Sequence, residues 1–219
     1  IGTILLLNIP SVQRQMSVFV ANELASILNS KISIGRINIG LLNRIIIDDL
    51  LLDDQSGKEM LKVTRLSAKF DILPLFSGKI SISNIQLFGF NINLSKQTPK
   101  DKPNFQFVLD AFASKDTVLR INSLLIRRGK VSYDVLSEKE TPGKFNPQHL
   151  RLRNIIANIS LKALQNDSIN AAIKRLSIEE EHSGFELKKL SLKVIGNDQR
   201  MKIENFAIDL PNTSLAMDT

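Results

Sequence analysis

The chain has 219 residues, of which 43% are hydrophobic, and it carries a formal net charge of +7. It contains no cysteine, which excludes disulfides, thiolate metal sites and cysteine nucleophiles. Its two histidines, His149 and His182, stand in no metal-ligand spacing. We therefore predict no metal, no cofactor and no catalytic residue, and we expect a protein that is not an enzyme, with carboxylate-based catalysis as the one enzymatic alternative.

Residues 1–10 are mostly apolar and end at Pro10. A membrane-spanning helix needs about 20 apolar residues, so we interpret this stretch as the end of a transmembrane anchor. An apolar strand and a signal-peptide remnant are the alternatives. Residues 11–30 repeat apolar side chains at helical spacing and predict an amphipathic helix that caps the end of a sheet. Its predicted apolar face consists of Val12, Met16, Phe19, Val20, Leu24, Ile27 and Leu28.

Residues 31–219 are predicted to form one continuous β-region, the start of a longer repeat sheet. A pattern h-x-h-x-x-h-x-h, in which h is apolar, starts at residues 32, 45, 61, 80, 119, 150, 171, 185 and 201. Alternation predicts strands with one apolar face, but the double x would flip that face in a regular strand. A β-bulge would keep all four apolar side chains together, whereas a corner would indicate a β-solenoid. The copies are irregularly spaced, so we favour long, bent, antiparallel strands.

Other segments complete the predicted β-region. Residues 90–94 and 131–135 alternate more simply and are predicted as two additional strands. Turns are expected at glycine-containing polar sites, among them Arg128-Gly129 and Ser183-Gly184. Residues 105–112 fit a short helix.

The predicted sheet is too large for its helices to cover. A sheet with one apolar face must bury that face, which leaves a closed barrel, a sandwich or a trough with an apolar interior. The apolar positions are mostly Ile, Leu and Val, and aromatic residues make up only 5% of the chain. This composition is compatible with a groove that acyl chains fill, but periodicity does not separate the three solutions.

Several motifs resemble those of the AsmA-like superfamily, most closely the N-terminal region of its TamB-like proteins of the Bacteroidota type. Residues 7–13, Leu-Asn-Ile-Pro-Ser-Val-Gln, are similar to the membrane exit of this family. The closest similarity lies in residues 73–90, which contain LPLFSGKISI followed by IQLFGF. Asn104-Phe105 resembles the Asn-Phe that precedes a short helix in the family.

The resemblance implies a mainly β fold, in which a long, open, bent antiparallel sheet curls into a taco-like hydrophobic groove with the N-terminal helix at its end. It implies a protein anchored in the inner membrane and located in the periplasm, which conducts phospholipid to the outer membrane. An Omp85-type outer-membrane barrel would be a partner through regions outside this chain. The alternative function is a periplasmic scaffold that assists outer-membrane β-barrel assembly with such a partner.

The groove-facing, lipid-binding residues would be apolar positions of the repeated pattern. They are Ile32, Ile34, Ile37, Ile39, Ile45, Ile47, Leu50, Leu52, Leu61, Val63, Leu66, Ala68, Ile80, Ile82, Ile85, Leu87, Leu119, Ile121, Leu124, Ile126, Leu150, Leu152, Ile155, Ile173, Leu176, Ile178, Leu187, Leu190, Leu192, Ile203, Phe206 and Ile208.

Charged residues fall mainly on the x positions and predict a solvated outer face. We interpret the acidic pairs at residues 48–49 and 53–54, and the acidic run at 179–181, as solvated rather than as calcium or acid–base sites. The basic residues lack interleaved aromatic residues, so we expect no nucleic-acid partner. Contact with anionic headgroups is a second interpretation of their charge. His149 and His182 are expected in loops or at an edge.

Overall fold

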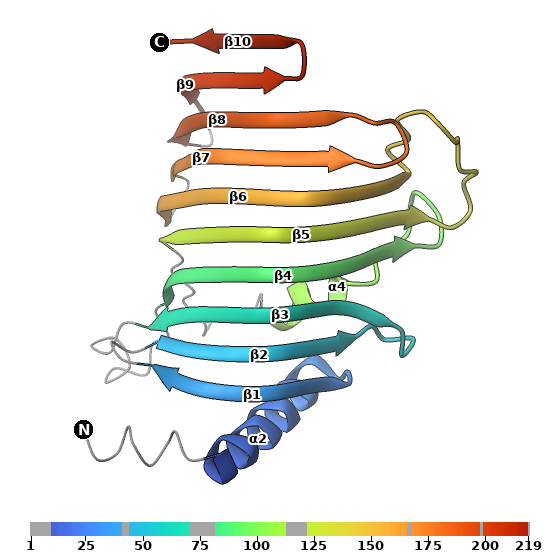
Figure 1. Ribbon diagram of the computed structural model, residues 1–219, viewed down its shortest axis with the longest axis vertical. Helices are drawn as coiled ribbons and strands as arrows, with labels where there is room; N and C mark the ends of the chain where they lie inside the picture. The colour runs from blue at the N-terminus through green and yellow to red at the C-terminus, as the bar shows by residue number, and fades with distance from the viewer. Residues whose placement is uncertain are drawn as a thin grey trace.

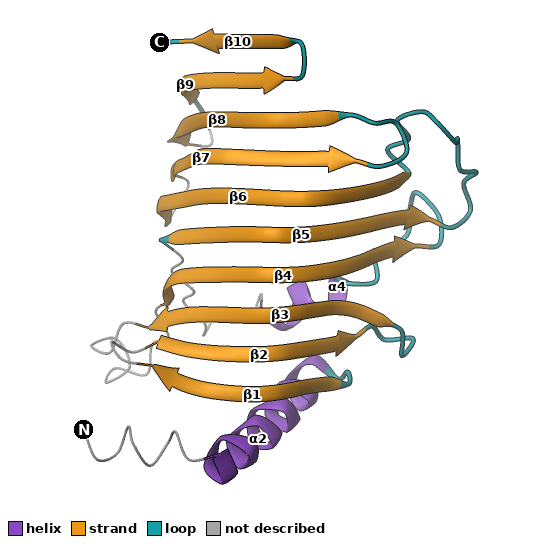
Figure 2. Ribbon diagram, in the orientation of Figure 1, coloured by secondary structure: helices purple, strands orange, loops and turns teal. Residues whose placement is uncertain are grey.

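The computed structural model describes residues 10–40, 44–70, 82–112, 122–165, 168–197 and 199–218. Within these ranges the chain forms one layer of ten strands with two helices (Figure 1, Figure 2). The elements are α2 (Pro10–Leu28), β1 (Ile32–Gly40), β2 (Arg44–Asp53), β3 (Glu59–Phe70), β4 (Ile82–Lys96), α4 (Gln106–Phe112), β5 (Ser123–Val135), β6 (His149–Gln165), β7 (Ser168–Glu180), β8 (Glu186–Asn197), β9 (Met201–Leu210) and β10 (Thr213–Met217). Of the predicted anchor, only Pro10 lies within the described residues, and it begins α2.

The strands lie in chain order, each beside the next, and β1 and β10 form the two edges of an open sheet. The prediction of a mainly β fold with an open sheet is confirmed. The antiparallel prediction is wrong for one pair, because β4 and β5 run parallel. Parallel neighbours need a crossover connection, and here it runs through residues 97–122, which include α4.

Two predicted strands are not separate elements. Residues 90–94 are the second half of β4, and residues 131–135 are the second half of β5. The predicted turn at Arg128-Gly129 lies inside β5. Gly89 and Arg128 adopt φ values of 64° and 56° in mid-strand, and the residues that allow such a conformation also mark turns in a sequence. Strand β10 was not predicted.

Helix α2 packs against β1 and β2, at the lower edge of the sheet in Figure 1. Its Ala21 forms a buried cluster with Ile34 and Ile37 of β1. The predicted apolar face is partly wrong, since Phe19 and Ile27 are 65% and 59% exposed.

The buried face of α2 also includes two polar residues. Gln13 donates from Nε2 to Oδ1 of Asn38 at 2.7 Å, and the Ser17 hydroxyl donates to the Gln13 carbonyl at 2.9 Å. These hydrogen bonds allow polar side chains on the packed face. The predicted short helix is observed as α4. Its residues Phe107, Val108 and Ala111 pack against a buried cluster that contains Leu28 and Leu52.

Candidate functional site

One residue in the middle of each of the first five strands is left out of the cross-strand pairing. These residues are Gly35, Asp49, Thr64, Gly89 and Arg128. They stand opposite one another on neighbouring strands, so the pairing resumes in register on both sides. We call this row the kink line. Asp49, Gly89 and Arg128 have positive φ, so the backbone turns locally at these residues on three of the five strands without a change in register.

The kink line keeps both halves of a strand on one face. In β1, Ile34 precedes and Ile37 follows the pair Gly35-Arg36, yet both isoleucines belong to one buried cluster. Ile47 and Leu50 of β2 flank Asp49 and pack against the same cluster. The expectation that the repeated pattern keeps its apolar side chains on one face is met in these strands. The mechanism is not the predicted β-bulge, because the pairing at the kink line sets one residue against one and does not shift in register.

Apolar residues are paired with apolar residues across the sheet. Because directly paired residues point to the same face, the pairing defines rows that cross many strands. The longest row crosses all ten described strands and consists of Ile37, Ile47, Leu66, Leu87, Ile126, Ala157, Leu176, Leu190, Ile208 and Leu215. We call this set the long row.

Three shorter rows accompany it. The second consists of Ile39, Ile45, Ala68, Ile85, Leu124, Ile159, Ile173 and Leu192. The third consists of Ile34, Leu50, Val63, Phe90, Gly129 and Ile155. The fourth consists of Ile32, Leu52, Leu61, Ile92, Val131 and Leu152.

The exposure of the long row changes along the sheet. Ile37, next to α2, is 3% exposed, whereas Leu215 on the edge strand β10 is 52% exposed. In the two buried clusters, the strand residues that pack with the helices come from β1, β2 and β3. The described helices therefore cover only the N-terminal end of the rows.

Most predicted groove residues fall in these four rows, and a few do not. Leu150 pairs with Tyr133, Ile178 pairs with Leu187, and Phe206 pairs with Met217. Ile203 pairs with Val194 and is 51% exposed. Ile80, Leu119 and Ile121 lie outside the described residues, and the side chain of Ile82 is not described.

The rows also contain residues that the sequence pattern did not assign to them. Ile92 and Val131 belong to stretches that were predicted as separate strands, and Gly129 was predicted as part of a turn. An added Cβ at Gly129 would meet the Phe90 ring and lie 3.0 Å from Cβ of Ile155. Here glycine leaves room for the ring of a neighbouring strand.

A buried carboxylate stands at the end of the fourth row, where Leu152 pairs with Glu180. Glu180 is 2% exposed, so the prediction of a solvated acidic run is wrong for this residue. It accepts hydrogen bonds from the Ser183 hydroxyl at 2.6 Å and from three backbone N–H groups, those of Ser183, His182 and Arg151, at 2.7 to 3.3 Å. Burial alone would raise the pKa of Glu180, but these hydrogen bonds lower it to about 2.

Asp54 has an equivalent role in the turn between β2 and β3, although solvation was predicted for it. It is 7% exposed and accepts from the backbone N–H groups of Ser56 and Lys58 at 2.8 and 3.0 Å. Burial opposes ionisation, but the hydrogen bonds from Ser56, Lys58 and Asn104 lower the pKa of Asp54. Both carboxylates accept hydrogen bonds from the backbone of the turns that they hold.

A third polar cluster joins β5 to β6. His149 is 5% exposed and begins β6, so the prediction of a loop or edge position is wrong for it. His182 lies in the turn after β7, as predicted. Nδ1 of His149 lies 2.9 Å from Oδ1 of Asp134, and Nε2 lies 3.0 Å from the Glu138 carbonyl. The hydrogen bond to Asp134 raises the pKa of His149, burial lowers it, and the Glu138 carbonyl raises it further.

The same cluster has the composition of a metal site but not its geometry. Asp134, Glu140 and His149 place one possible ligand atom each within 4.8 Å of one another. However, both imidazole nitrogens of His149 already have protein partners, and Nη1 of Arg151 lies 2.9 Å from the Asp134 carboxylate. A metal ligand needs a nitrogen with a free lone pair, so we interpret these residues as a structural charge cluster.

No family model matches the chain, and no curated protein matches it in sequence. Among the described residues, no helix is both long and apolar enough to cross a membrane.

Proposed function

We propose that this chain is part of a bridge that conducts phospholipid between two membranes along the apolar rows of its sheet. The observation that carries the proposal is the long row, whose ten paired positions are all apolar. At about 4.8 Å between strands, nine intervals span roughly 43 Å. An apolar face of this length must be covered by something, and in this proposal lipid acyl chains cover it as the filling of a groove.

The mechanism requires continuity rather than a reactive group. Each methylene of an acyl chain gains about 0.8 kcal/mol when it leaves water for an apolar surface. Successive positions of the long row offer similar aliphatic side chains, so an acyl chain that moves by one strand exchanges one contact for an equivalent one. The proposal therefore places no catalytic residue in the chain.

The AsmA-like resemblance supplies the setting of this proposal. In that setting the protein is anchored in the inner membrane by its N-terminal segment, lies in the periplasm and delivers phospholipid to the outer membrane. Helix α2, which packs on the first two strands, would close the end of the groove. An Omp85-type barrel would be contacted by regions outside this chain.

Site-specific photocrosslinking tests the lipid path. Photoreactive residues at Ile85 and Leu124, which are paired in the second row, should capture labelled phospholipid in cells. The matched control is Gln86, the neighbour of Ile85 on the opposite face of β4. Capture by the first two and not by the control is expected. Equal labelling at all three positions, or none at any, would count against a lipid path.

The scaffold alternative would use a sheet edge, and β10 is the C-terminal edge of the described strands. All five of its residues, Thr213–Met217, are exposed, and its partner among the described strands is β9. An open edge can add a strand from a partner protein. Ala216→Pro should then impair outer-membrane protein assembly, while Leu190→Asp should not. The lipid-transfer proposal predicts the reverse order of effects on phospholipid delivery.

A further inference from the structure

The face opposite the apolar rows has three open hollows, and the first two of them include residues of the kink line. The first hollow, of about 500 Å³, is lined by Gly35, Arg36, Asp48, Asp49, Thr64, Arg65 and Phe88. The second, of about 420 Å³, is lined by Phe88, Leu125, Arg127, Arg128, Ile156, Asn158 and Arg175. The third, of about 250 Å³, is lined by Asn154, Ile156, Arg175, Ser177, Ile178, Glu179, Glu186, Leu187 and Lys188. Shared residues make the three hollows neighbours.

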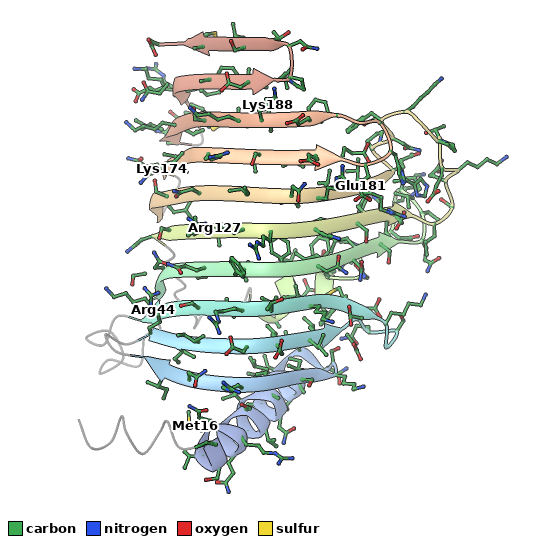
Figure 3. All side chains as sticks on the ribbon, viewed as in Figure 1. Met16, Arg44, Arg127, Lys174, Glu181 and Lys188 are labelled. Carbon is green, nitrogen blue, oxygen red and sulfur yellow. The ribbon has the colours of Figure 1, made fainter. Side chains whose placement is uncertain are left out.

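Charge distinguishes the second hollow from the other two. The first contains two arginines and two aspartates, and the third contains one arginine, one lysine and two glutamates. The second contains three arginines and no acidic residue. Figure 3 labels one of them, Arg127, on β5. We call this second hollow the basic hollow.

The arginines of the basic hollow lack carboxylate partners. Next to the other hollows, Arg65 lies 2.6 Å from Asp48, and Arg153 lies 2.9 Å from Glu179. None of the ion pairs within the described residues involves Arg127, Arg128 or Arg175. Arg175 also lines the third hollow together with Glu179 and Glu186, but it forms no ion pair with them among the described residues. Three neighbouring cations repel one another, and an anion would relieve this repulsion.

The sheet holds these side chains around a partly apolar floor. Arg127 follows Ile126 of the long row and therefore points to the opposite face. Asn158 pairs with Leu125 on one side and with Arg175 on the other, which brings β5, β6 and β7 to the same site. The guanidinium of Arg128 lies 5.0 Å from the centre of the Phe88 ring, a cation–π contact.

We propose that the basic hollow binds a phosphate-bearing anion. Guanidinium groups bind phosphate through two parallel N–H donors. Arg127 on β5 and Arg175 on β7 would approach the phosphate from both sides, since their strands lie about 10 Å apart. Asn158 between them can donate from its amide. This site lies on the face opposite the apolar rows and is independent of the lipid path proposed above.

Calorimetric titration of the 219-residue chain with pyrophosphate in low-salt buffer tests this site. Saturable binding is expected, and Arg127→Gln with Arg175→Gln should weaken it by about tenfold or more for each lost arginine. The matched control is Arg36→Gln with Lys62→Gln, which removes the same charge from exposed positions on the same face and should change the affinity less than about twofold. Arg127→Lys with Arg175→Lys keeps the charge but loses bidentate geometry, so intermediate binding is expected.

Vesicles distinguish the two sources of the phosphate. Preferential binding to phosphatidylcholine vesicles that contain phosphatidylglycerol, lost in the glutamine variant but not in the control, would assign the site to lipid headgroups. Pyrophosphate binding without such a preference would assign it to a free phosphoanion. Absence of saturable binding to both probes, equal weakening by the control, or tighter arginine-dependent binding of a single-stranded oligonucleotide would overturn the proposal.

Discussion

The buried Glu180 carboxylate should make an unusually large contribution to stability. Its pKa falls from the ordinary 4.5 to about 2. At about 1.4 kcal/mol per pH unit, this depression corresponds to roughly 3 kcal/mol of folding free energy. Because the pKa is lowered in the folded state, the contribution is present above pH 4.5 and is lost as the pH falls toward 2. We expect Glu180→Gln to destabilise the chain at neutral pH by about this amount.

Urea denaturation followed by circular dichroism measures this effect. A glutamine amide in place of one carboxylate oxygen would face N–H donors, which explains the loss. Glu181→Gln is the matched control, since Glu181 is an exposed neighbour that lies 3.7 Å from Arg153, and it should cost less than about 1 kcal/mol. If Glu180→Gln cost as little as Glu181→Gln, or cost the same near pH 3 as near pH 7, the assigned role of Glu180 would be wrong.

Three further changes test other parts of the structure. Asp134 raises the pKa of His149 above 6.5, so the stability that the protonated imidazole contributes is present below pH 6.5 and is lost as the pH rises through the raised pKa. The difference in melting temperature between the unchanged chain and His149→Gln should therefore be smaller at alkaline pH than at acidic pH. Gly129→Ala should destabilise the chain by about 1–3 kcal/mol because its Cβ meets the Phe90 ring. Adding Phe90→Leu to this variant should restore part of the lost urea midpoint, and no rescue would contradict the contact. Asp49 has a φ of 55°, so Asp49→Val should lower the free energy of unfolding by about 1–2 kcal/mol and Asp49→Gly should hardly change it. Equal losses for the two variants in chemical denaturation would argue against backbone strain at this residue.

The alternation of side chains predicted the sheet because burial on one face leaves a period of two in the sequence. It also predicted an irregularity at the polar pair Asp48-Asp49, which would otherwise place Ile47 and Leu50 on opposite faces, but it did not predict that neighbouring strands share this irregularity in register. It failed where local residue preference and long-range pairing differ. A separate strand was predicted to begin at residue 90 and a turn was predicted at Arg128-Gly129, yet β4 and β5 continue through these positions beside partner strands.

The polar residues show a different limit of sequence analysis. Glu180 stands between two other glutamates, Glu179 and Glu181, and nothing in that run distinguishes the buried one. Its burial depends on the hairpin that brings the Ser183 hydroxyl to it. In the same way, the uncompensated charge of Arg127 and Arg175 depends on the pairing of β5, β6 and β7, which a one-dimensional pattern does not contain.

The kink line connects the two surfaces of the sheet. A regular strand would send the second half of each apolar pattern to the opposite face, and the long row would then share a face with charged residues. The unpaired residues prevent this, and on the opposite face they line the hollows, Asp49 in the first and Arg128 in the basic hollow. One backbone feature therefore accounts for both the continuity of the apolar rows and the position of Arg128 on the opposite face.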